Sequence, residues 1–141
     1  MKTRIATMAA ITLIAIQLTL AGEPAKKFAT EDQTITFVTK NLMNGLRSTN
    51  IGLIESAMKM TAQMKMRYPA ANVSSLVNVL NELVQNHPSG VTRYKAYIAL
   101  SVCENPEWYA NEETMVTANE ENFFQNASNH MQEHLLSASS N

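Results

Sequence analysis

Apolar side chains recur every three or four residues along much of the chain, which is the spacing of one face of an α-helix. The stretch 89–103 carries them on nearly all sides, leaving only Arg93, Lys95 and Ser101 polar. One face holds Val91, Tyr94, Ile98 and Val102, and a second holds the small residues Thr92, Ala96, Ala99 and Cys103. A helix of this kind has neighbours on more than one side, so we expect it at the centre of the domain.

The same spacing predicts further helices over about 31–47, 51–67, 73–85 and 117–136. Asn50 and Asn72 are predicted to cap the second and third of these. A short helix is expected to begin at Pro106, because proline favours the first helical position. Sustained alternation of polar and apolar residues is absent, so no strand is expected. The predicted fold class is all-α, with about five main helices.

Two helix–turn–helix units repeat at a spacing of about 37–40 residues. The pattern Val91-x-Arg93-x-x-Ala96-x-x-Ala99-Leu100 resembles the second helix of a HEAT-type (armadillo-type) repeat, and residues 50–57 are similar to the same position in a preceding repeat. The resemblance implies antiparallel helical hairpins that form a short right-handed α-solenoid or bundle. It also implies a binding scaffold rather than an enzyme. Residues 96–106 are in addition similar to a tetratricopeptide helix, which is the second choice.

The first residues follow the three-part pattern of a secretory signal peptide. Lys2 and Arg4 precede an apolar run over residues 5–20, and Ala21 and Gly22 are small residues suited to cleavage. We therefore expect a signal peptide over 1–21, a linker over 22–30, a helical-repeat domain over 31–136 and a frayed tail over 137–141. The protein is expected to be exported, periplasmic or secreted, with no stable membrane anchor after cleavage.

Charge is unevenly distributed along the chain. The sequence has 11 Lys and Arg and 12 Asp and Glu, but no Lys or Arg follows residue 95. The acidic C-terminal segment is either an interaction tail or, as we favour, folds back against the basic first half. No basic stripe with interleaved aromatic residues is present, so nucleic acid is not an expected partner. The lone Cys103 excludes an internal disulfide and is expected to be a buried, inert thiol.

Two patterns raise the alternative that the protein binds a metal. His130 and His134 are four residues apart with Glu133 between them, a spacing that suits zinc on one helix face. Met60 and Met64 also share a face, and thioethers suit Cu(I). A peptidase would need a further ligand and a substrate cleft, and methionine is also an adaptable core filler. The alternative is therefore a small periplasmic copper- or zinc-binding protein.

No nucleophile–base pair, phosphate loop or dinucleotide fingerprint appears, so we expect neither an enzyme nor a cofactor. The favoured function is a non-catalytic exported domain that binds a protein partner or, as a second possibility, copies of itself. Trp108, Tyr109 and Arg93 are the candidate partner-binding residues, because Trp, Tyr and Arg dominate binding hot spots. For Trp108 and Tyr109 the competing interpretation is that they seal the end of the helical core.

Overall fold

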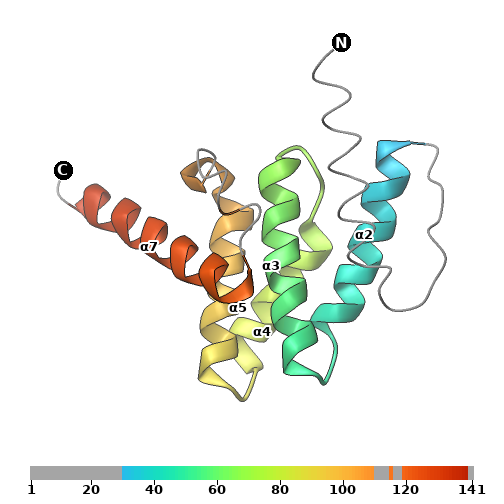
Figure 1. Cartoon of the computed structure of the whole chain (residues 1–141), viewed down its shortest axis with the longest axis horizontal. Coiled ribbons are helices and arrows are strands. Elements are labelled where there is room, and N and C mark those ends of the chain that lie inside the picture. The colour runs from blue at the N-terminus through green and yellow to red at the C-terminus, as the bar shows by residue number, and fades with distance from the viewer. Residues whose placement is uncertain (1–29, 110–114, 116–118, 140–141) are drawn as a thin grey trace, which may run out of the picture. The chain divides into compact units, whose positions relative to one another are not determined.

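The computed structural model of the chain describes residues 30–109, 115 and 119–139, and every regular element among them is helical. In chain order these are α2 (Glu31–Leu46), α3 (Ile51–Arg67), α4 (Ser74–Asn86), α5 (Gly90–Glu104), the 3₁₀ helix η2 (Pro106–Tyr109) and α7 (Glu120–Ser139) (Figure 1). The all-α prediction is confirmed. The predicted signal peptide, the linker up to residue 29 and the last two tail residues lie outside the described residues.

The chain divides into two compact units, Met1–Asn41 and Leu42–Asn141. In the first unit, the hydroxyl oxygen of Thr30 accepts a hydrogen bond of 3.3 Å from the backbone N–H of Gln33 at the start of α2. The last turn of α2, residues 42–46, belongs to the second unit. The second unit also holds α3, α4, α5, η2 and α7, and it is the subject of the paragraphs that follow.

Helix α5 packs against α3, α4, α7 and η2, which confirms its predicted central position. The small-residue face is buried as predicted, because Thr92, Ala96, Ala99 and Cys103 are all enclosed. The other face is buried at Ile98 and Val102 only, whereas Val91 and Tyr94 are 64% and 46% exposed. For these two residues the expected burial is wrong, because α7 encloses this face only from Ile98 onward.

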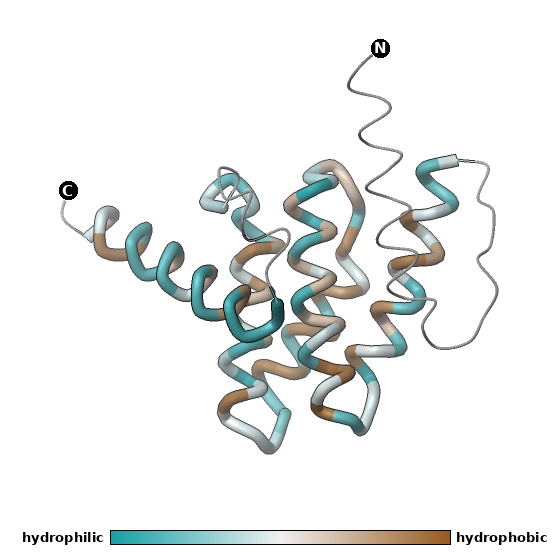
Figure 2. The backbone as a smooth tube through the Cα atoms, viewed as in Figure 1, coloured by the Kyte–Doolittle hydropathy of each residue, from teal (hydrophilic) through white to brown (hydrophobic). Residues whose placement is uncertain are grey.

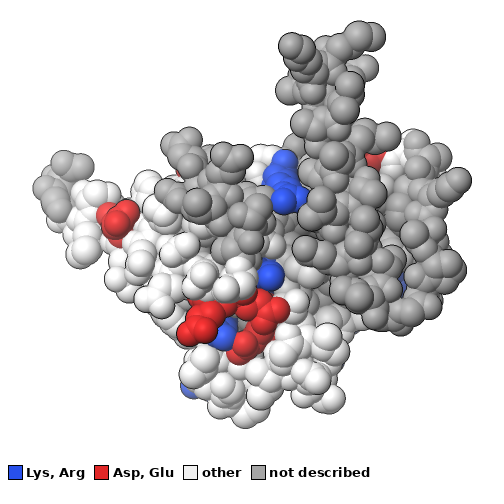
Figure 3. Space-filling view, viewed as in Figure 1, with Lys and Arg blue, Asp and Glu red and all other residues white. Residues whose placement is uncertain are grey.

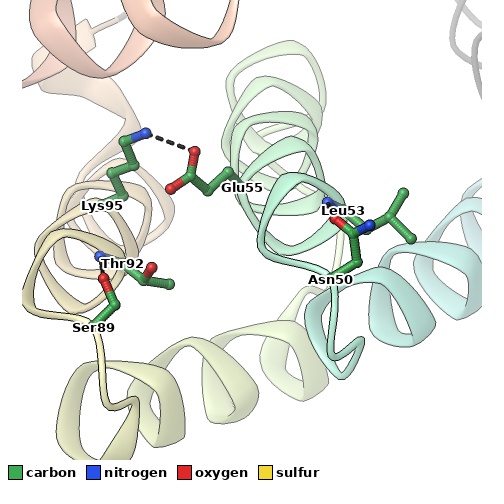
Figure 4. Close-up of polar contacts among 6 residues, drawn as sticks. All are labelled: Asn50, Leu53, Glu55, Ser89, Thr92 and Lys95. Carbon is green, nitrogen blue, oxygen red and sulfur yellow. Dashed lines mark hydrogen bonds and ion pairs between the residues drawn. The ribbon is translucent and has the colours of Figure 1, made fainter.

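Helices α3 and α5 run in the same direction and pack against each other, and α4, which connects them in the chain, packs against α5 (Figure 1). Both α3 and α5 begin with a side-chain cap: Asn50 Oδ1 accepts from the Leu53 N–H at 3.2 Å, and Ser89 Oγ accepts from the Thr92 N–H at 3.3 Å (Figure 4). The two caps occupy corresponding positions of the predicted repeat units. The prediction of Asn50 as a cap is confirmed.

The prediction of Asn72 as the cap of α4 is wrong by one residue. Val73 occupies the cap position, without a side-chain cap bond, and the helix begins at Ser74. Asn72 Oδ1 instead accepts from the backbone N–H and the hydroxyl of Ser74, at 3.0 and 2.7 Å. Because Val73 is buried, its hydrophobic contacts outweigh the loss of a side-chain cap, which costs about 1 kcal/mol.

Helix α7 is hydrophilic along most of its length (Figure 2). It packs on α3, α5 and η2, so the part of the acidic C-terminal segment that forms α7 folds back onto α3, which agrees with the favoured alternative. Its buried residues are Phe123, Phe124, Ala127 and Met131. Leu135, predicted on the same face, is 51% exposed, because α7 continues to Ser139 without burying any residue after Met131.

Candidate functional site

An open groove of about 360 Å³ lies between α5 and α7. Helix α5 contributes Val91, Tyr94, Lys95 and Ile98, and α7 contributes Glu121, Phe124, Gln125, Ser128, Asn129 and Gln132. Ile98 and Phe124 form its buried, apolar part. The Tyr94 hydroxyl and the Ser128 hydroxyl share a hydrogen bond of 2.7 Å that joins the two walls. The groove is therefore built from side chains held on two packed helices.

Lys95 interacts with two other helices of the unit. Its Nζ lies 2.7 Å from Glu55 Oε2 on α3 (Figure 4) and 5.3 Å from the centre of the Phe124 ring. Both side chains of this ion pair are largely covered, with 23% and 16% of their surface exposed. Lys95 thus joins α3, α5 and α7, and its charge is offset before any ligand arrives.

The groove leaves large apolar side chains open to solvent. Val91 and Tyr94 are both exposed large hydrophobic residues, although they belong to the central helix of the unit. A larger cleft of about 580 Å³ lies between the turn 47–49 and the end of α4. Its apolar lining includes Leu46, Ile54 and Val79, which are all buried, whereas the groove also carries the exposed side chains of Val91 and Tyr94. The groove is the better candidate site.

The predicted site residues on η2 and α7 lie together at one corner of this unit. The rings of Trp108 and His134 stack, with centroids 5.1 Å apart and planes at 11°. The rings of Tyr109 and His130 meet edge to face, with centroids 6.4 Å apart. The sequence analysis selected all four of these residues as candidates, but nothing in the helical spacing indicated that the two aromatic residues would contact the two histidines.

Tyr109 seals the core rather than facing solvent. It is fully buried, and its hydroxyl shares a hydrogen bond of 2.9 Å with the buried Ser101 hydroxyl. Burial raises the pKa of Tyr109 above its ordinary value, and the Ser101 hydrogen bond opposes this rise. Of the predicted aromatic pair, only Trp108 is partly exposed.

Arg93 lies at the turn between α4 and α5. Its Nη1 donates to the carbonyl oxygens of His87 and Pro88, at 2.7 and 3.1 Å. The guanidinium group therefore satisfies carbonyls at the end of α4. This contact gives Arg93 a structural role at the turn, independent of any partner.

The candidate metal-binding residues are spread over two helices. His130 Nδ1 lies 3.7 Å from Glu133 Oε2, and the His134 ring lies against Trp108. On α3, Met64 is buried and Met60 is partly exposed. Within residues 30–109, 115 and 119–139, no group of three or more His, Cys, Asp or Glu side chains could hold a metal ion.

Cys103 is buried, and desolvation raises the pKa of its thiol from 9.0 to about 12. The thiolate is the nucleophilic form of cysteine, so this side chain is unreactive at ordinary pH. The prediction that this thiol is buried is confirmed.

The groove itself was missed from the sequence. Periodicity placed Tyr94 and Val91 on a face of α5 that was expected to be covered, and it placed Phe124 on the apolar face of α7. Which part of one helix covers the other depends on how α7 crosses α5, and helical spacing does not encode that crossing. An aromatic residue in the first turns of a helix that is apolar on nearly all sides was the one available indication.

The fold and the groove define the class as an all-α helical bundle with an open groove between two of its helices. No family model, curated protein or solved structure matches the chain. The resemblance to HEAT-type repeats therefore stays a prediction. Among the described helices, none combines the length and the apolar character that crossing a membrane requires.

Proposed function

We propose that this protein is a non-catalytic, exported domain that binds a protein partner on its helical surface, mainly at the groove between α5 and α7. The observation that carries the proposal is the exposure of Val91 and Tyr94 beside a buried apolar floor. Both are presented by the helix that the rest of the unit packs around, so they are held in place before binding. A prearranged site of this kind loses little conformational entropy when it binds.

Tyrosine suits such a site because it contributes a large, rigid ring with a polar end. Residues of this type, placed centrally in a contact, account for most of the binding energy of protein interfaces. The neighbouring Val91 adds further apolar surface at about 25 cal/mol per Å² buried. A partner that covers both side chains would remove from water the apolar surface that α7 leaves open.

The buried state of Cys103 argues against a cysteine nucleophile. It is the only cysteine of the chain, and its enclosure keeps the thiol protonated. For the alternative, metal binding by His130 and His134 or by Met60 and Met64, no observation in the described part of the chain adds support. The aromatic corner around Trp108 remains a second candidate surface for the same partner.

Site-specific photo-crosslinking tests the proposal. The photoreactive residue p-benzoylphenylalanine would replace Tyr94 in one variant and Tyr97 in another, and both would be produced in the native host. Tyr97 is a matched control because it lies on the same helix, is 45% exposed and does not line the groove. We expect a discrete crosslinked protein at position 94 and none at position 97. Equal crosslinking at both positions, or none at position 94, would refute the proposal.

A further inference from the structure

The groove has an acidic end. Glu121 lines it and is exposed in the first turn of α7, and Glu120 precedes it. Figure 3 shows acidic atoms gathered around basic ones on this face of the unit.

The one basic side chain of the groove does not offset Glu121. Lys95 is paired with Glu55 at 2.7 Å and lies over Phe124, so its charge is already balanced. The remaining polar lining residues, Gln125, Ser128, Asn129 and Gln132, are uncharged. The net charge that the groove presents to a ligand is therefore negative.

The apolar and acidic parts of the groove are adjacent. Glu121 lies one turn before Gln125 on α7 and three residues before Phe124, whose ring forms part of the floor. The Tyr94 ring stands at the opposite wall. A ligand that fits must place an apolar group and a cationic group within a few ångströms of each other.

We infer that the groove between α5 and α7 binds a peptide segment of a partner protein in which a Lys or Arg stands beside a large apolar residue. The apolar side chain contacts Val91, Tyr94 and Phe124, and the cationic group pairs with Glu121. The electron-rich face of the Tyr94 ring also favours a nearby cation. This inference rests on the proposed function and names the chemistry of the partner.

The test uses fluorescence polarisation with the mature protein and three fluorescein-labelled peptides. One peptide carries two Lys–Leu pairs, and the other two carry Gln or Glu in place of each Lys. We expect the Lys peptide to bind most tightly, the Gln peptide more weakly and the Glu peptide least. Raising the salt from about 0.05 M to about 0.5 M should weaken binding of the Lys peptide alone, because screening affects only the charge pairing.

Matched variants separate the contribution of charge pairing at Glu121 from that of apolar contact at Tyr94. Glu121→Gln should weaken the Lys peptide about threefold, the size expected for one exposed ion pair, and should leave the Gln peptide unchanged. Glu133→Gln, the same change near the far end of α7, should leave both unchanged. Tyr94→Ala should weaken both peptides about tenfold, whereas Tyr97→Ala should have no effect. Tyr94→Phe keeps the ring and loses only the Ser128 hydrogen bond, so it should bind nearly normally if the variant folds.

Failure of the inference can be told from failure of the proposed function. If all three peptides bind equally and Tyr94→Ala weakens each of them, the charge argument is refuted and the binding function stands. If the crosslinked species at position 94 is a second copy of the chain, the assigned occupant is refuted. If Tyr94→Ala and Tyr97→Ala behave alike and nothing crosslinks at position 94, both proposals are refuted.

Discussion

Gly45 allows the end of α2 to approach α3 closely, and adding one methyl group there should destabilise the protein. A Cβ on residue 45 would lie 2.8 Å from the Cβ of Ala57 and 3.6 Å from the carbonyl oxygen of Leu53. Carbon atoms in good contact are about 3.5–4.0 Å apart. Since Ala57 is buried and its Cβ cannot rotate away, the two helix backbones must separate.

The expected magnitude is a balance of two effects. Replacing a helical glycine by alanine stabilises a helix by about 0.5–1 kcal/mol. Overpacking a buried contact costs about 1–3 kcal/mol. Gly45→Ala should therefore lower the free energy of unfolding by about 0.5–2 kcal/mol, which corresponds to about 3–5 °C in Tm per kcal/mol for a domain of this size.

In a double-mutant cycle with Ala57→Gly, the effect of Gly45→Ala on the free energy of unfolding should change sign. With the opposing methyl group removed, Gly45→Ala should stabilise the protein by about 0.5–1 kcal/mol. The measurement is urea and thermal unfolding of the four proteins, followed by circular dichroism at the helical band. A higher Tm for Gly45→Ala in the otherwise unchanged protein would refute the reasoning, because it would mean that the two helices are not in close contact at this point.

Three further predictions concern buried polar groups of α5 and its neighbours. Thr92 Oγ1 is buried without a hydrogen-bond partner, so Thr92→Val, a change of nearly equal volume, should raise the free energy of unfolding by about 1 kcal/mol in urea denaturation. Tyr109→Phe should lower it by about 1–2 kcal/mol, because the buried Ser101 hydroxyl loses its partner, and Ser101→Ala in the same protein should restore most of the loss. Burial raises the pKa of Cys103 from 9.0 to about 12, so the folded state binds the thiol proton more tightly than the unfolded state does. The protonated thiol therefore contributes its full share of stability below pH 9, and this share is lost as the pH rises towards 12. The fall in urea midpoint between pH 8 and pH 10.5 should therefore be smaller in Cys103→Ala, and an equal fall would contradict the pKa assignment.

Periodicity was sufficient to locate the helices and much of the core. The range 51–67 for α3 and the cap at Asn50 agree with the structure, and so does the buried small-residue face of α5. These features depend on residues close together in the sequence, where spacing and side-chain chemistry decide the outcome. Asn72 is the exception, because burial of Val73 decides where α4 begins.

The candidate site was harder to predict because it depends on contacts between distant segments. Tyr94 is exposed because of the line along which α7 crosses α5. Leu135 is exposed because α7 continues beyond the core at that point. The pairing of Trp108 with His134 depends on the same crossing. A helical pattern reports which face of each helix is apolar, but it does not report which part of that face a neighbour covers.

The position of Trp108 gives the protein a built-in optical reporter. It is the only tryptophan of the chain, and its ring is stacked on His134 of α7. Because α7 also forms one wall of the groove, any movement of this helix away from η2 separates the two rings and changes the emission of a single fluorophore. The docking of α7 can thus be followed in the unlabelled protein, in real time and at low concentration, while a ligand enters the groove.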